Sequence, residues 1–375
     1  MGSARAPTND GPAVRVPPLR TGGSVLFRFE QSAGPHTVGL TVLNLPGAAN
    51  TARSLQTLIW YPASPRGGAR MTVDDYLGLF DEERAAPVPE VAVRTRDWRA
   101  GMSASLRTRL WAVRDAPRTS GQFPLVIYAP GYSNPAWENA DLCEYLASHG
   151  YLVLASPSMG VETPYPTLDL QGAHQQARDI LFLVDLAQTL PDAQISALAV
   201  AGFSWGGLCN VIAAARDARI RGLVALDGGL LFHPGLLREG TETLARRMTI
   251  PLLSIAQAQS SEQSDEALDA WVHGDLVNVK FAGFTHAEHV AMAQRNEAIW
   301  QRLYELYPAK KMQHGREKAV VSYGWLARYT LEFLNAYLKH NAAGQAFLRR
   351  MPEENGAPAG LMAAHFRAAR ATDCG

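Results

Sequence analysis

The segment at positions 202–206, which reads Gly-Phe-Ser-Trp-Gly, constrains the fold of this chain more than any other. It follows the apolar run 198–201 and precedes a stretch with helical spacing at 206–215. A G-x-S-x-G sequence between a strand and a helix is typical of a tight turn that lifts the serine hydroxyl above a sheet. Glycines flank the serine because a Cβ there would collide with the neighbouring strand or helix. We therefore predict that Ser204 is a nucleophile at the carboxyl edge of a sheet.

Apolar strand-like segments alternate with helical segments after residue 121. The strand-like runs lie at 125–128, 151–155, 198–201, 222–226, 251–256 and 277–281. Strands that are apolar on both faces predict a parallel sheet covered by helices on both sides. Two earlier segments, 38–42 and 55–59, alternate apolar and polar residues and predict antiparallel strands at the sheet edge. Together with the serine turn, this pattern predicts the α/β class, namely the α/β-hydrolase fold with a doubly wound, mostly parallel sheet.

The chain divides into three predicted parts. Residues 1–22 are rich in Pro, Gly and Arg and are predicted to be disordered. Residues 23–345 are predicted to form one α/β-hydrolase domain, with insertions near 65–120 and 228–250 where the alternation of strands and helices is interrupted. Residues 346–375 are predicted to form a C-terminal tail.

Charge balance and hydropathy argue against a nucleic-acid-binding surface and against a transmembrane helix. The chain has 35 Lys and Arg against 35 Asp and Glu, so we expect no nucleic-acid-binding surface. No run approaches about 18 uninterrupted apolar residues, so we expect no transmembrane helix. The first twenty residues lack the apolar core of an intact signal peptide. Three cysteines do not describe a disulfide framework; we expect Cys143 and Cys209 in the core and Cys374 exposed.

A serine nucleophile needs a histidine to accept its proton and an acid to orient that histidine. In the predicted fold these groups follow one another as serine, acid and histidine. Asp227 directly follows the strand 222–226 and precedes two glycines, so its carboxylate is expected at the sheet edge. Glu262 and Asp265 are the competing acids, but neither lies close behind the strand 251–256. We therefore favour Asp227.

His286 lies in a loop after the strand 277–281, where the general base is expected. His289 is the nearest alternative, but it is expected on the helix that starts there. His286, Glu288 and His289 together could also indicate a metal site. The two histidines lack the i, i+4 spacing of H-E-x-x-H, and no third ligand is evident, so we expect no metal.

The oxyanion of an acyl-transfer intermediate needs two backbone donors. One is expected to be the N–H of Trp205, and the other the N–H of Tyr132 in the loop after the strand 125–128. The rings of Tyr132, Trp137 and Trp205 are candidates for an apolar substrate-binding region. Core packing explains Trp137 equally well.

Several segments resemble bacterial carboxylic ester hydrolases of the platelet-activating-factor acetylhydrolase type, which are related to dienelactone hydrolases. The segments that carry the resemblance are 57–63, 123–131, 145–151 and 202–207. The resemblance extends from about residue 37 to about residue 340. It implies ester cleavage without a metal or an organic cofactor, with the acid and the base at Asp227 and His286. This chain has Pro130 before Gly131, whereas the family loop often reads His-Gly.

The expected function is hydrolysis of carboxylic esters by a serine esterase, through an acyl-enzyme and a Ser-His-Asp triad. The expected partner is a small-molecule or lipid-like ester. An amidase or peptidase, an acyltransferase and a non-enzymatic member of the same fold remain as alternatives. Rates on matched ester and anilide substrates, product analysis in alcohol and water, and labelling by a fluorophosphonate distinguish them.

Overall fold

The computed structural model describes residues 26–46, 54–64, 67–82, 89–160, 163, 165–239, 242–258, 260 and 262–370. The predicted disordered segment 1–22 and Cys374 lie outside the described residues. Cys143 and Cys209 are free and buried, as core residues are expected to be.

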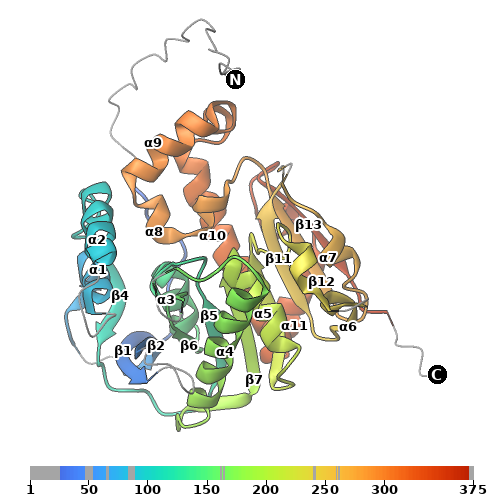
Figure 1. Cartoon of the computed structure of the whole chain (residues 1–375), viewed down its shortest axis with the longest axis horizontal. Helices are drawn as coiled ribbons and strands as arrows, with labels where there is room; N and C mark the ends of the chain where they lie inside the picture. The colour runs from blue at the N-terminus through green and yellow to red at the C-terminus, as the bar shows by residue number, and fades with distance from the viewer. Residues whose placement is uncertain are drawn as a thin grey trace, which may run out of the picture.

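An eleven-stranded sheet forms the centre of the molecule (Figure 1). Its six middle strands run parallel, in the order β12, β11, β8, β7, β5 and β6. Their bounds are β5 Phe123–Ala129, β6 Leu152–Ala155, β7 Ala193–Phe203, β8 Ile220–Leu226, β11 Leu252–Gln257 and β12 Leu276–Phe281. Each strand contains the corresponding predicted run or all but its first residue, so the prediction of a parallel sheet is confirmed.

Strands at both edges of the sheet complete it. Beyond β6 lie β2, β1, β4 and β3, and beyond β12 lies β13. Their bounds are β1 Thr37–Pro46, β2 Ser54–Ala63, β3 Arg70–Thr72, β4 Arg109–Arg114 and β13 Met362–Arg367. β2 is antiparallel to both β6 and β1, as expected for the N-terminal strands. β4 then runs parallel to β1.

Two predicted segments differ from what the structure contains. The predicted insertion near 65–120 holds β3, α1 (Val73–Glu82), α2 (Pro89–Gly101) and β4, so part of it extends the main sheet. The predicted tail from residue 346 includes the end of α11 (Ala342–Arg349) and the edge strand β13. β13 pairs antiparallel with β12 along its whole length. It is short and alternates buried Met362 and Ala364 with exposed neighbours, which makes it a weak signal in the sequence.

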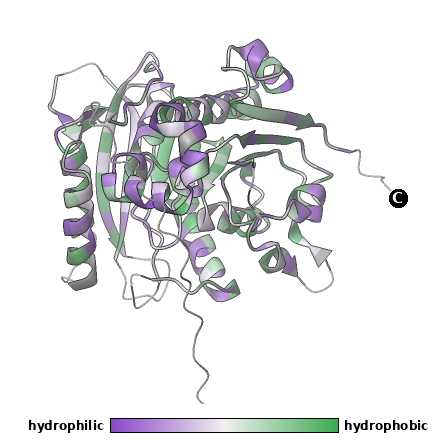
Figure 2. Cartoon of the chain, turned by 90° about the horizontal axis from the view of Figure 1, so that it is seen from above, coloured by the Kyte–Doolittle hydropathy of each residue, from purple (hydrophilic) through white to green (hydrophobic). Residues whose placement is uncertain are grey.

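Helices cover both faces of the sheet, and the sheet separates two apolar cores. One core contains α3 (Ala140–Ser148), α10 (Pro308–Leu338) and α11, and the other contains α4 (Leu170–Ala187), α5 (Trp205–Ala214), α6 (Leu244–Arg247) and α7 (Glu266–Asp269). In Figure 2 the helices carry both hydrophilic and hydrophobic bands, as expected for elements that face solvent on one side. Within the described residues, no helix combines the length and apolar character needed to cross a membrane.

Short elements after β8 and β12 surround the carboxyl edge of the sheet. After β8 come η1 (Pro234–Leu237), β9 (Arg238–Glu239), β10 (Glu242–Thr243) and α6, within the predicted insertion 228–250. After β12 come η2 (His286–His289), α8 (Ala291–Gln294) and α9 (Glu297–Leu306). α10 follows and is kinked at Gly315, where φ is 64°. Residues of α9 and of the first turn of α10 line the same cavity as Ser204, so this segment forms one wall of the candidate site.

Candidate active site

Ser204 occupies a sharp turn between β7 and α5. Its φ of 50° and ψ of −119° lie outside the regions that a serine ordinarily adopts, so the backbone is strained there. The turn is held because the Ser204 N–H donates to the Leu226 carbonyl at 3.0 Å and the Gly229 N–H donates to the Ser204 carbonyl at 2.6 Å. A Cβ at Gly206 would lie 2.1 Å from the Ala129 carbonyl oxygen, so only glycine fits there.

Ser204, His286 and Asp227 are joined by two hydrogen bonds. The Ser204 Oγ lies 2.9 Å from the His286 Nε2, and the His286 Nδ1 lies 2.6 Å from the Asp227 Oδ2. The three residues come from the ends of β7, β8 and β12, because parallel strands end at one edge of the sheet. This geometry fits a proton on the His286 Nδ1 and a free lone pair on its Nε2, toward the Ser204 hydroxyl.

Asp227 is fully buried and accepts several hydrogen bonds. The Gln263 side chain donates to its Oδ1 at 2.8 Å, and both the backbone N–H and the side chain of Gln257 donate at 3.2 Å. Burial by itself raises the pKa of this carboxyl, but the His289 and His286 imidazoles and the Gln257 N–H outweigh burial and hold the pKa below its ordinary value. Asp227 is therefore ionised at neutral pH and able to orient the imidazole.

The loop that carries His286 is fastened by Glu288. The Thr285 N–H and hydroxyl both donate to the Glu288 carboxylate, which forms a capping box at the start of η2. The same carboxylate forms a buried ion pair with Lys311 at the start of α10. These contacts tie the histidine loop to the helix that forms one wall of the cavity.

His289, the alternative base, lies in the interior rather than at the turn. Its ring is fully buried against Phe284, with ring centroids 4.5 Å apart, and its Nδ1 lies 3.1 Å from the Thr285 carbonyl. Burial lowers the pKa of His289 below its ordinary value. In the part of the chain that the structure describes, no group of three or more His, Cys, Asp or Glu residues is arranged to hold a metal ion.

Tyr132 lies in the loop between β5 and α3, and Trp205 directly follows Ser204. Trp205 is the first residue of α5, and the first N–H groups of a helix have no acceptor within it. Neither the Tyr132 N–H nor the Trp205 N–H donates a hydrogen bond to another described residue. Both N–H groups therefore lack an acceptor among the described residues.

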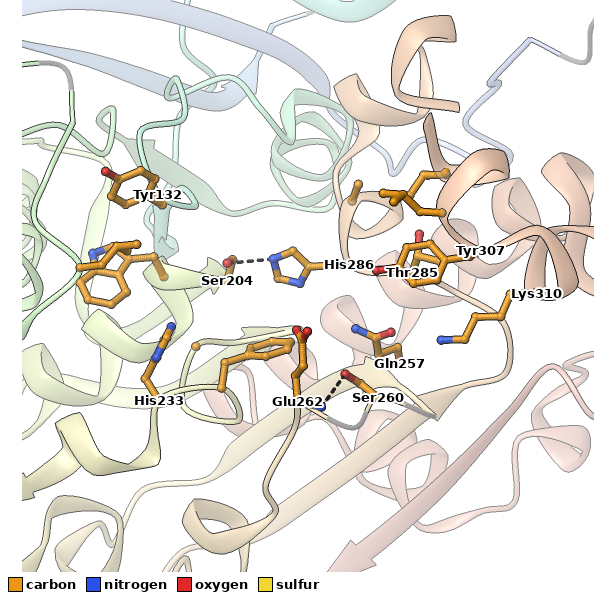
Figure 3. Close-up of a pocket in the computed structure, with 17 residues that line it drawn as sticks. Tyr132, Ser204, His233, Gln257, Ser260, Glu262, Thr285, His286, Tyr307 and Lys310 are labelled. Atoms are coloured by element: carbon orange, nitrogen blue, oxygen red, sulfur yellow. Dashed lines mark hydrogen bonds between the residues drawn. The ribbon is translucent and has the colours of Figure 1, made fainter. Parts of the chain in front are cut away.

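A cavity of about 1150 Å³ opens above these groups and contains Ser204 and His286 in its wall (Figure 3). Figure 3 shows the two side chains facing each other, with Tyr132 on one side of them and His233 and Glu262 on the other. The remaining labelled polar residues are Gln257, Ser260, Thr285 and Lys310. Part of the wall is apolar. We call Leu168, Leu303, Leu306 and Tyr307 the apolar rim.

Three residues of the apolar rim are unusually exposed for their type. Relative exposure is 56% for Leu168, 52% for Leu306 and 43% for Tyr307. Exposed apolar side chains that gather at the mouth of a cavity are typical of a ligand-binding surface. The sequence does not indicate the rim, because neither α9 and α10 nor the segment of Leu168 before α4 carries a motif. The only local signal is the Leu-Tyr-Pro sequence at 306–308, which marks a break between helices.

The three predicted substrate-binding residues lie in different surroundings. Tyr132 and Trp205 line the cavity that contains Ser204. Trp137 does not line it; its ring is 2% exposed and packs edge-on against Trp98, with centroids 5.8 Å apart. Trp137 therefore packs against Trp98 of α2, which agrees with the core-packing alternative and gives no support to a substrate-binding role.

Comparisons with known proteins bear on the fold. A chlorophyllase family model matches residues 102–227, a third of the chain that contains Ser204 and Asp227 but not His286. A ferulic acid esterase from Streptomyces cinnamoneus has a similar structure, with a TM-score of 0.62 and 19% sequence identity over 90% of this chain and 98% of that one. A search of curated proteins finds no significant match. The predicted α/β-hydrolase fold is confirmed by the structural match.

Proposed function

We propose that this protein is a serine hydrolase that cleaves carboxylic esters, with Ser204 as nucleophile, His286 as general base and Asp227 as the orienting acid. The observation that carries the proposal is the hydrogen-bonded chain from the Ser204 Oγ through the His286 imidazole to the buried Asp227 carboxylate, at the wall of an open cavity. Such a chain supplies the nucleophile and the proton acceptor that acyl transfer requires.

In the first step, the Ser204 Oγ attacks the ester carbonyl carbon as its proton moves to the His286 Nε2. The carbonyl oxygen becomes an oxyanion, which accepts hydrogen bonds from the N–H groups of Tyr132 and Trp205. When the carbonyl re-forms, the bond to the alcohol oxygen breaks, and that oxygen takes the proton from the His286 Nε2. The alcohol leaves, and the acyl group stays on Ser204.

In the second step, a water molecule attacks the acyl-enzyme. His286 accepts a proton from the water as its oxygen bonds to the acyl carbon. The proton then passes to the Ser204 Oγ as the acid leaves, so the enzyme returns to its starting state. Throughout, the Asp227 carboxylate stabilises the charged imidazole, since the lowered pKa of Asp227 keeps the carboxylate ionised.

Ester cleavage agrees with the names of the similar proteins. The structural neighbour is a ferulic acid esterase, and the chlorophyllase family model spans the loop of Tyr132 and the turn of Ser204. The resemblance to platelet-activating-factor acetylhydrolases and dienelactone hydrolases favours the same reaction. The apolar rim beside the polar groups of the cavity favours an ester with an apolar part.

The decisive experiment is Ser204→Ala, assayed with p-nitrophenyl acetate. We expect turnover to fall by about 10⁴-fold or more, because the nucleophile is removed. Ser254→Ala is the control: Ser254 is buried in β11, and its hydroxyl has no hydrogen-bond partner among the described residues, so the change is expected to leave activity intact. Activity near that of the wild type in Ser204→Ala would refute the proposal.

Labelling by a fluorophosphonate provides a second measurement. The probe should attach to Ser204, and the label should be absent from Ser204→Ala. An unlabelled wild-type protein would favour a non-enzymatic role. Faster cleavage of anilides than of matched esters would favour an amidase, and alcohol esters formed in mixed solvent would favour an acyltransferase.

A further inference from the structure

Two backbone N–H groups are proposed as oxyanion donors. Trp205 begins the helix after Ser204, whereas Tyr132 lies in the loop between β5 and α3. Its first residue is Pro130, which has neither a backbone N–H nor a polar side chain with which to fasten the loop. The N–H of Tyr132 can nevertheless stabilise an oxyanion only if the loop is held within a fraction of an ångström. Some other group must therefore fix the loop.

Glu138 lies beneath this loop and is bonded to it at two points. The Gly131 N–H donates to the Glu138 Oε1 at 3.0 Å, and the Asn134 side-chain amide donates to the Glu138 Oε2 at 2.6 Å. These two residues flank Tyr132 in the loop. The Tyr128 hydroxyl, at the end of β5, donates to the Glu138 Oε1 at 2.7 Å. The carboxyl thus joins the strand end to both ends of the turn.

The opposite side of the loop is held by α4 and by the segment after β6. The Gln176 side chain donates to the Pro130 carbonyl at 2.8 Å, and the Ser158 N–H donates to the Asn134 carbonyl at 3.0 Å. The Ser158 hydroxyl also donates to the Gln176 side chain at 3.1 Å. The Arg94 guanidinium of α2 also donates to the Ser133 hydroxyl and to the Ser133 carbonyl, both at 2.9 Å. The loop is therefore held from several sides, and Glu138 is the only acidic group among the contacts named here.

The Glu138 carboxyl is costly to bury. The side chain is fully buried, and no ion pair among the described residues involves it. Burial raises the pKa of Glu138 to about 7, although all three hydrogen bonds act to lower it. A buried carboxyl without a counter-ion contributes little to stability. Its hydrogen bonds go to the proposed oxyanion loop and to the strand before it, which points to a role in the reaction.

We propose that Glu138 is a positioning residue, whose two oxygens hold the 131–134 turn so that the Tyr132 N–H faces the oxyanion formed at Ser204. This inference rests on the proposed function. It differs from the histidine-glycine loop of the resembled family, since here the anchor is a carboxyl that comes seven residues after the loop glycine.

The test compares Glu138 with Glu144, a matched buried carboxyl on α3. Glu144 is 1% exposed, accepts from the Tyr76 hydroxyl at 2.6 Å and accepts from the Trp111 N–H, but it does not contact the loop. Burial raises the pKa of Glu144 as well, to about 8. Each position is changed to Ala and to Gln, and kcat and KM are measured with p-nitrophenyl acetate.

Glu138→Ala should lower kcat by about 100-fold and change KM by less than about threefold, because the oxyanion forms only in the transition state. Glu138→Gln should retain kcat within about fivefold, since its amide oxygen can accept from Gly131 and Tyr128 and its NH₂ can donate to a flipped Asn134. Glu138→Asp keeps the charge but is one methylene shorter, so kcat should fall at least about tenfold. The Glu144 variants should keep the wild-type kcat.

Three outcomes would overturn the inference: wild-type kcat in Glu138→Ala, equal losses in the Glu138 and Glu144 variants, or an active Glu138→Asp beside an inactive Glu138→Gln. If Glu138→Ala fails to fold, the comparison of Glu138→Gln with Glu138→Asp decides alone. Ser204→Ala separates this result from the function itself. An active Ser204→Ala refutes the proposed function, whereas an inactive Ser204→Ala with an unaffected Glu138→Ala refutes only the role of Glu138.

Discussion

Substitution of Gly206 by alanine tests whether the turn at Ser204 depends on close contact between two backbones. An added Cβ would lie 2.1 Å from the Ala129 carbonyl oxygen and 2.7 Å from the Pro130 carbonyl oxygen. Real Cβ atoms essentially never approach other heavy atoms more closely than 3.0 Å, so the Ala129 carbonyl would have to move by the difference, 0.9 Å. Both neighbours are backbone atoms, which cannot rotate away as a side chain can.

Movement of Ala129 would displace the loop that carries Tyr132. We expect an overpacking cost of about 1–3 kcal/mol in the free energy of unfolding, as for other insertions into packed cores. We also expect kcat to fall by about 100-fold, because a displacement of about 1 Å in a group that stabilises the transition state has an effect of that size. The two effects have one cause and should appear together.

Urea denaturation measures the first effect, and turnover of p-nitrophenyl acetate measures the second. Gly222→Ala is the matched control in the neighbouring strand β8. Its Cβ would meet nothing closer than the Phe333 ring at 3.5 Å, which is ordinary contact, so stability and kcat should change little. The reasoning is refuted if Gly206→Ala has both wild-type stability and wild-type kcat.

Three further changes have defined outcomes. Lys311→Met should lower the free energy of unfolding by about 3–5 kcal/mol, because the buried Glu288 carboxylate loses its counter-ion. A loss under about 1 kcal/mol, measured by urea denaturation, would contradict this expectation. Burial raises the pKa of Glu144 from 4.5 to about 8, so the free energy of unfolding contains a contribution that is lost as pH rises through this range. Glu144→Gln should remove that dependence, and equal slopes between pH 5 and pH 9 in variant and wild type would count against it. Leu306→Ser should lower the ratio of kcat/KM for p-nitrophenyl octanoate to kcat/KM for the acetate about fivefold. The control is Met351→Ser, at a similarly exposed residue outside the cavity, which should leave this ratio unchanged. An unchanged ratio in both variants would exclude a role of the rim in chain-length preference.

The sequence was sufficient to predict the parallel sheet and to select the residues that meet at its edge. Asp227 directly follows an apolar run, His286 lies in the loop after another, and the carboxyl ends of parallel strands share one edge. The position of these two residues can be predicted from where the strands end and from the order of the strands along the chain. For the same reason the choice of Asp227 over Glu262 agrees with the observed contact to His286.

Contacts between distant segments could not be read from the sequence. Gln263, which donates to Asp227, lies in the polar segment after β11, where a side-chain amide carries no sequence signal comparable to that of a catalytic acid. The apolar rim depends on how α9 packs over the sheet edge, and no local pattern encodes that position. Trp137 was ambiguous because a large ring near an oxyanion loop can face either the cavity or the core.

The edge strand β13 protects the neighbouring strand β12 from pairing with other chains. Its pairing with β12 covers the hydrogen-bonding groups along the outer side of that strand. The Arg370 N–H further donates to the Val272 carbonyl at 2.8 Å. A protein shortened before residue 362 would leave β12 with a bare edge, which other chains could extend by adding strands of their own. Purification handles therefore belong beyond residue 370, and a truncated form should precipitate before it loses its helices.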